Sequence, residues 1–107
     1  MKNVVRVFLA VLTFALVSTT WSFAEGAADM YKSKCAVCHG ATGAGDTAMG
    51  KSMKIRDLGS ADVQKQSDAE LATIIGTGKG KMPGYESKGV TKDQINDLVK
   101  YIRTLKK

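Results

Sequence analysis

The apolar positions change their spacing near residue 25, and this change divides the chain into two parts. Residues 7–17 are almost continuously apolar, whereas beyond residue 26 there are three stretches in which apolar side chains recur every three or four positions. Spacing of three or four places side chains on one face of a helix. Such stretches span residues 27–38, 67–75 and 91–105. The pattern therefore predicts an all-α domain whose core lies between helix faces.

The second and third of these stretches begin with helix start signals. Ser67 with Glu70, and Thr91 with Gln94, have the spacing of a capping box, in which each side chain satisfies a backbone N–H of the first turn. Two closely spaced glycines end the second stretch, as is typical of helix ends. The predicted buried stripes are Leu71, Ile74 and Ile75 in the second stretch and Ile95, Leu98, Val99, Ile102 and Leu105 in the third.

Residues 40–59 contain five glycines and no sustained period. Glycine-rich sequence without periodicity favours irregular structure. We expect this segment to be a loop wrapped around whatever fills the centre of the domain.

The first 24 residues have the layout of a secretory signal peptide. Lys2 and Arg6 precede the apolar run, and small residues at Ser22 and Ala24 form a cleavage site. The alternative is an uncleaved membrane anchor, but the run is shorter than the ~20 residues that a spanning helix needs. We favour cleavage after Ala24, with a second possible site after Ala28. Residues 25–107 then form one exported domain, located in the periplasm and without stable membrane insertion.

Removing 24 of the 107 residues leaves 83, and only thirteen of these are Ile, Leu or Val. The tryptophan and all three phenylalanines leave with the signal peptide. This is little material for a core, because a domain of this size buries a modest fraction of its surface. Small exported domains commonly compensate with disulfides or a metal. A further group at the centre of the domain is therefore expected.

Both cysteines and the only histidine lie within five positions, at Cys35, Cys38 and His39. A disulfide here would close a very short loop and constrain the unfolded chain little. A thioredoxin-like redox pair needs a βαβ setting, for which no strand pattern is present. A structural zinc site needs four ligands. The pattern C-x-x-C-H is instead typical of covalent haem attachment, with one haem c bound through the two cysteines and with His39 as an iron ligand.

A second axial ligand has to come from another residue type, since no second histidine exists. Methionine is a suitable soft donor, and Met82 lies among glycines and directly precedes Pro83, the only proline of the chain. Met53 is the next candidate. Met49 is interpreted as filling a gap beside the haem, and Met30 as a core residue. Cys35, Cys38, His39 and Met82 are thus the predicted cofactor-binding residues, and His39 and Met82 the predicted metal ligands.

The motifs "CAVCHG", "GKGKMPGY" and "LVKYIRTL" resemble those of a class I monohaem cytochrome c, and the similarity extends from about residue 27 to 105. The resemblance implies three to five helices around one covalently bound haem, with the first and last helices crossing. It also implies an aromatic contact at that crossing, for which Tyr31, Leu98 and Tyr101 occupy the matching positions.

Two features depart from this family pattern. The usual glycine at the helix crossing is Ala27, with Gly26 beside it, so the two helices are expected slightly further apart. The usual proline whose carbonyl orients the histidine has no counterpart in residues 40–59. The sequence therefore names no acceptor for His39.

Two axial protein ligands would close the iron to substrates, which favours a one-electron carrier in a respiratory or related redox chain over an enzyme. The alternatives are a haem subunit of a larger oxidoreductase, and a ligand-binding haem protein whose sixth position is labile. Against the second alternative, the chain has no distal histidine and no convincing distal arginine beyond Arg56.

The charge of the chain bears on its partners. Sixteen Lys and Arg against ten Asp and Glu give a formal charge of +6, which falls to +4 without Lys2 and Arg6. Lys79, Lys81 and Lys88 lie near Met82 in the sequence. If they surround the haem edge, they would attract acidic docking patches on redox proteins or membrane oxidoreductase complexes. The alternative is that they only keep the protein soluble. Nucleic-acid binding is not expected, because the charge excess is small and no aromatic platform is present. We expect a monomer.

Overall fold

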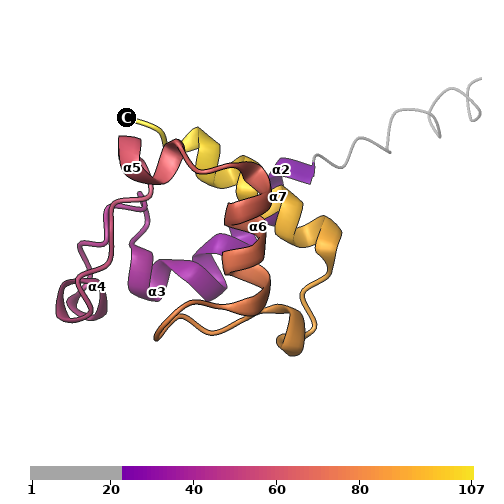
Figure 1. Ribbon diagram of the computed structural model, residues 1–107, viewed down its shortest axis with the longest axis horizontal. Coiled ribbons are helices and arrows are strands. Elements are labelled where there is room, and N and C mark those ends of the chain that lie inside the picture. Colours follow the sequence, from indigo (N-terminus) through magenta and orange to yellow (C-terminus); the bar gives the residue numbers. More distant parts are fainter. Residues whose placement is uncertain (1–22) are drawn as a thin grey trace, which may run out of the picture.

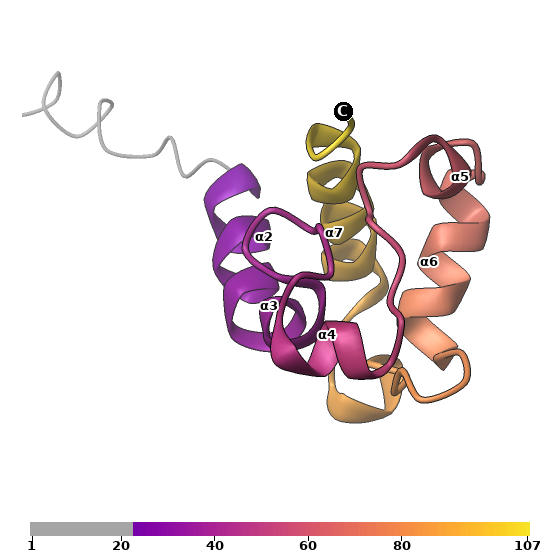
Figure 2. The same ribbon diagram turned by 90° about the vertical axis from the view of Figure 1, so that its left-hand side faces the viewer.

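The computed structural model describes residues 23–107 and is helical, as predicted (Figure 1). Its elements in chain order are α2 (Phe23–Met30), the π-helical turn η1 (Tyr31–Cys35), α3 (Ala36–His39), α4 (Ala48–Ser52), α5 (Ala61–Gln64), α6 (Asp68–Thr77), the 3-10 turn η2 (Glu86–Lys88) and α7 (Lys92–Thr104). The β-structure within these residues consists of one isolated antiparallel β-bridge, between Lys79 and Met82. Figure 2 shows α2 and α3 on one side, α5 and α6 on the other, and α7 between them.

The first helix lies against the last one. In Figure 1 α7 crosses in front of α2, and the two helices are in contact. Ala27 is buried where they meet, whereas a Cβ atom on the neighbouring Gly26 would meet nothing within 4 Å. The backbones of α2 and α7 are therefore closest at Ala27 and not at Gly26. One turn later the rings of Tyr31 and Tyr101 pack with their centroids 4.9 Å apart.

The core lies where α2, α6 and α7 meet. α7 buries four of its five predicted apolar positions, and Leu105 is half-buried. On α6, Leu71 and Ile75 are buried and Ile74 is half-buried. The buried hydrophobic residues are Ala27, Tyr31, Val63, Leu71, Ile75, Val90, Ile95, Leu98, Val99 and Ile102.

Both capping boxes predicted from the sequence are present. The Ser67 hydroxyl accepts from the Glu70 N–H while the Glu70 carboxylate accepts from the Ser67 N–H, and Thr91 and Gln94 make the same reciprocal pair. The helices begin directly after these caps, because each pair satisfies two backbone N–H groups that have no partner within the helix.

The expectation of a structureless loop over residues 40–59 was wrong for one part of it. Residues 48–52 form α4, which Thr47 caps by accepting from the Gly50 N–H. Thr47 also donates its hydroxyl hydrogen bond to the Cys38 carbonyl, at 2.9 Å, so α4 is fastened to α3. A helix of five residues has no hydrophobic period, and this one depends on tertiary hydrogen bonds instead.

The signal peptide predicted for residues 1–24 lies, up to residue 22, outside the described residues. Within residues 23–107, none of the helices combines the length and the apolar character required to cross a bilayer.

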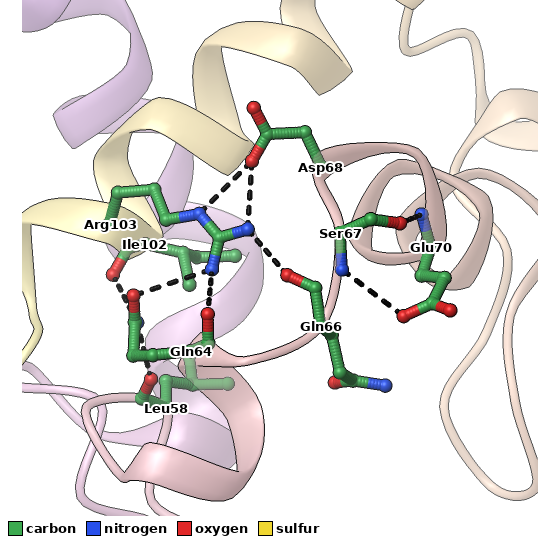
Figure 3. A network of polar contacts seen from close by, with 8 residues as sticks. All are labelled: Leu58, Gln64, Gln66, Ser67, Asp68, Glu70, Ile102 and Arg103. Atoms are coloured by element: carbon green, nitrogen blue, oxygen red, sulfur yellow. Dashed lines mark hydrogen bonds and ion pairs between the residues drawn. The ribbon is translucent and has the colours of Figure 1, made fainter.

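A polar network around Arg103 joins α7 to the segment between α5 and α6 (Figure 3). The guanidinium donates to the main-chain carbonyls of Gln64, at 2.8 Å, and Gln66, at 2.6 Å, and forms two hydrogen bonds with the Asp68 carboxylate. The Gln64 amide in turn donates to the carbonyls of Leu58 and Ile102. Arg103 therefore satisfies carbonyls that the tight turn leaves without helical partners.

The Arg103 network predicts an unequal cost for removing two cations from α7. Arg103→Met leaves two carbonyls without donors, so we expect the free energy of unfolding to fall by about 1.5–3 kcal/mol. Lys100→Met is the control, because Lys100 pairs only with Asp97 on the surface, at 3.9 Å, and should change stability by less than about 0.5 kcal/mol. Urea denaturation of the purified protein measures both. Equal effects would contradict the role given to the network.

The contact between α4 and α3 predicts the sign of a glycine substitution. Helix propensity alone would make Gly50→Ala stabilising. A Cβ atom at Gly50 would instead lie 2.5 Å from the carbonyl oxygens of Cys38 and Gly45, so we expect Ala to destabilise the protein by about 1–3 kcal/mol. Gly26→Ala is the matched control in α2, where a Cβ has open space, and should be neutral or stabilising by up to about 1 kcal/mol. Thermal unfolding measures both variants, and a stabilising Gly50→Ala would show that α4 does not pack closely against the Cys38 and Gly45 carbonyls.

Candidate functional site

A two-lobed cleft lies between the Cys35–His39 segment and the segment around Met82. One lobe has a volume of about 240 Å³ and is bordered by both cysteines and by Met53, Ile55 and Tyr85. The other has about 100 Å³ and reaches into the core against Leu71 and Ile74. Both lobes are bordered by Cys35, His39 and Met82. The structure thus brings all four predicted site residues to one cleft.

The three residues of the C-x-x-C-H pattern lie at the end of one continuous helical segment. Cys35 ends the π-helical turn, and Cys38 and His39 belong to α3. Both cysteines are half-buried free thiols. Burial raises the pKa of Cys35 to about 11, with the neighbouring Lys34 opposing the shift. The thiol therefore stays neutral at pH 7, which makes it a poor ligand for a bare metal ion.

Three consecutive carbonyls at the end of this segment accept hydrogen bonds from two side chains and one loop N–H. The Cys38 carbonyl accepts from the Thr47 hydroxyl, the His39 carbonyl from the Gly45 N–H at 2.7 Å, and the Gly40 carbonyl from the buried Tyr31 hydroxyl at 2.7 Å. These are carbonyls of the last helical turn, which have no partner within the helix. The position of His39 is consequently fixed through its backbone.

The imidazole of His39 is itself half-buried. Burial lowers its pKa, so the neutral form, which can bind iron, predominates at pH 7. Its Nδ1 atom is buried and has no hydrogen-bond partner among the described residues. The family's proline has no counterpart in residues 40–59, and within residues 23–107 no other acceptor takes its place. The ring is therefore placed by the backbone and by packing.

The Met82 segment folds back on itself beside the end of α6. Lys79 and Met82 exchange two backbone hydrogen bonds around a two-residue turn with Gly80 at a φ of +58°. Gly78 and Gly84 form the neck of this turn: a Cβ atom on Gly78 would lie 2.6 Å from the Met82 carbonyl oxygen, and one on Gly84 would lie 2.7 Å from the Gly76 carbonyl oxygen. Only glycine permits backbones to approach this closely.

The four methionines of the described part of the chain have different positions. Met49 is 50% exposed on α4, and Met30 packs against the core. Met53 borders only the larger lobe, whereas Met82 borders both lobes together with His39. Met82 is thus better placed than Met53 to contact a group that fills the whole cleft.

The donor set fits covalently attached haem better than a bare metal ion. The described residues contain no group of three or more His, Cys, Asp or Glu side chains that could hold a metal. Two thiols at one wall, a neutral imidazole, a thioether and an apolar inner lobe match the needs of a large apolar macrocycle with an iron at its centre. The residues present therefore fit the group that the sequence pattern indicates.

Two features of the site were not predicted from the sequence. Ile74 was assigned to the core stripe but borders the inner lobe. Tyr85 was quoted within a motif without a role, yet its ring borders the larger lobe and its hydroxyl donates to the Lys34 carbonyl at 3.0 Å. The aromatic residue three positions after Met82 was the one available signal for it.

Comparisons with known proteins agree with this geometry. Residues 23–102 match the family model described as cytochrome C oxidase, cbb3-type, subunit III. The solved structure of a protein named KustC0563 c-type cytochrome is similar, with 29% sequence identity and a TM-score of 0.69, covering 76% of this chain and 98% of that one. No functionally curated protein matches the chain. The chain belongs to the family of cytochrome c oxidase, cbb3-type, subunit III, and is a small monohaem c-type cytochrome.

Proposed function

We propose that this protein is a monomeric periplasmic electron carrier that transfers one electron at a time in a respiratory or related redox chain. Membership of the cytochrome c family implies covalently bound haem c and haem-based electron transfer, and proteins of this kind are generally exported. The proposal adds attachment through Cys35 and Cys38, axial ligation by His39 and Met82, and the absence of catalysis.

The observation that supports this most directly is the placement of Met82. It borders both lobes of the cleft together with His39 and comes from the opposite segment of the chain. A thioether and an imidazole on facing walls form the donor pair of electron-transferring cytochromes c. Such a pair leaves no position for a substrate, which is why we propose a carrier and not an enzyme.

In this proposal haem c supplies the one-electron chemistry, and the residues of the chain position it and exclude water. The fixed carbonyls of Cys38 and His39 hold the neutral imidazole in place during both halves of the redox cycle. The apolar inner wall, including Leu71 and Ile74, keeps the surroundings of the cleft at a low dielectric. Low dielectric and methionine ligation both favour the reduced state.

The charges around the cleft support an acidic partner. Lys34, Lys79 and Lys81 are exposed and border the larger lobe. Among the described residues none of these three forms an ion pair, and no carboxylate borders either lobe. Unpaired cations at the mouth of a cleft attract a negatively charged surface to it. The same lysines would also maintain solubility. The salt dependence of the electron-transfer rate distinguishes this role from docking.

The description of the matching family favours a second candidate, in which the protein is a haem subunit of a larger oxidoreductase. The two exposed large hydrophobics of the described residues, Val37 and Met49, lie on α3 and α4, which are in contact with each other. Apolar side chains exposed next to the cofactor segment would suit a lasting subunit contact. Sedimentation of the native protein from its source membranes distinguishes a free carrier from a subunit.

Removal of Met82 tests the proposed ligation. In the oxidised, haem-loaded protein, Met82→Ala should abolish the weak far-red absorption band of methionine-sulfur ligation and allow carbon monoxide to bind the reduced form. Met53→Ala is the matched control and should leave both properties unchanged. If the wild type already lacks the band and binds carbon monoxide readily, the sixth position is labile and the carrier proposal fails. Loss of the band in Met53→Ala instead would reassign the ligand.

Charge reversal at the cleft tests the proposed docking face. Oxidation of the reduced protein by the hexacyanoferrate(III) anion should be several-fold slower in Lys79→Glu than in the wild type at low ionic strength, and the two rates should converge at high salt. Lys100→Glu reverses the same charge at an exposed residue of α7 that borders neither lobe, and should have a much smaller effect. Equal effects of the two variants would indicate that these lysines serve solubility alone.

A further inference from the structure

Tyr85 connects two parts of the cleft that are far apart in the sequence. It follows Met82 by three residues, and its hydroxyl donates to the carbonyl of Lys34, 51 residues earlier, at 3.0 Å. Lys34 directly precedes the first cysteine of the haem-binding pattern. Among the described residues, no other hydrogen bond joins residues 78–85 to residues 31–39.

The acceptor lies in an unusual part of the helix. In the turn η1 the Ala36 N–H bonds to the Tyr31 carbonyl, five residues back, instead of four. Single π-helical turns within α-helices occur frequently at functional sites, because the extra residue redirects neighbouring groups. Here the turn carries both Lys34, whose carbonyl accepts from Tyr85, and Cys35, which borders the cleft.

The backbone of Tyr85 is held firmly on the other side. Its N–H donates to the Ile75 carbonyl at 2.9 Å, and its own carbonyl accepts from the N–H groups of Lys88 and Val90. The Lys88 ammonium also lies 5.4 Å from the centre of the ring. The backbone of Tyr85 is therefore fixed against α6 and η2, and its side chain extends from there to η1.

Residues 79–83 lie between this fixed point and the end of α6. They are held to each other by the Lys79–Met82 pair, and Gly78 and Gly84 form their neck. Separation of this whole side, Met82 and Tyr85 together, from the helical segment that carries Lys34 and Cys35 would move Met82 away from His39. The Tyr85 hydroxyl joins the two sides, so its hydrogen bond opposes such a movement. Burial raises the pKa of Tyr85, which keeps the hydroxyl protonated and able to donate.

We propose that Tyr85 is a positioning residue whose hydroxyl latches the Met82 segment to the haem-binding helix and thereby sets how readily Met82 gives way to an external ligand. This inference rests on the proposed ligation by His39 and Met82. It assigns to this hydrogen bond a part of the free energy that keeps the sixth position closed to external ligands.

The test is the binding of imidazole to the oxidised, haem-loaded protein. Tyr85→Phe retains the ring that borders the cleft and removes only the hydroxyl. One net hydrogen bond to a backbone carbonyl favours the closed segment by a factor of about three to ten. We therefore expect imidazole to bind Tyr85→Phe about three- to tenfold more tightly than the wild type, with the methionine band still present in the absence of imidazole.

Two further variants make the result decisive. Tyr101→Phe removes a hydroxyl that borders neither lobe and should leave imidazole affinity unchanged. Met82→Ala sets the affinity of a fully open site. If the wild type binds imidazole as tightly as Met82→Ala does, the proposed ligation fails and the latch with it.

If the wild type is closed but Tyr85→Phe has wild-type affinity, the ligation stands and the latch is wrong. A hydroxyl that only stabilised the fold would lower the free energy of unfolding in urea without tightening imidazole binding, and this outcome also overturns the proposal. A raised affinity with an unchanged response in Tyr101→Phe supports it.

Discussion

The domain is organised around a shortage of apolar side chains at its centre. Its buried hydrophobic residues form a core where α2, α6 and α7 meet, and the space between α3 and the Met82 segment remains a cleft. In a c-type cytochrome this space belongs to a covalently bound macrocycle, whose apolar area contributes ~25 cal/mol per Å² removed from water. Residues such as Leu71 and Ile75 therefore pack against the core and also border the cleft.

A core that is shared with a cofactor has to be held together by polar contacts at its edges. The carbonyls of Cys38, His39 and Gly40 accept hydrogen bonds from Thr47, Gly45 and Tyr31, and Arg103 donates in the same way to carbonyls near α5. Each bond contributes little by itself, but each fixes a segment that has too few apolar neighbours to be fixed by packing. The rigidity of the site thus depends on the main chain more than on side-chain packing.

The long elements and the cofactor residues could be predicted from the sequence because their signals are local. Helix α7 has a period of three to four and a capping box within fifteen residues, and the haem-binding pattern occupies five. Helix α4 and the contact of Tyr85 have no such signal. The first depends on Thr47 reaching the Cys38 carbonyl, and the second on a hydroxyl reaching a carbonyl 51 residues away. Main-chain acceptors have no residue identity, so no sequence pattern reports them.

The distribution of charge connects stability with recognition. The four ion pairs of the described residues engage Lys65, Lys100, Arg103 and Lys107, all of which lie on α5, on α7 or directly beside them. The lysines that border the cleft have no carboxylate partner. Since pairing a cation lowers the field it projects into solvent, the unpaired Lys34, Lys79 and Lys81 contribute positive potential at the mouth of the cleft. In the proposed carrier, the position of these unpaired charges beside the cleft, and not the size of the net charge, would select the face presented to an acidic partner.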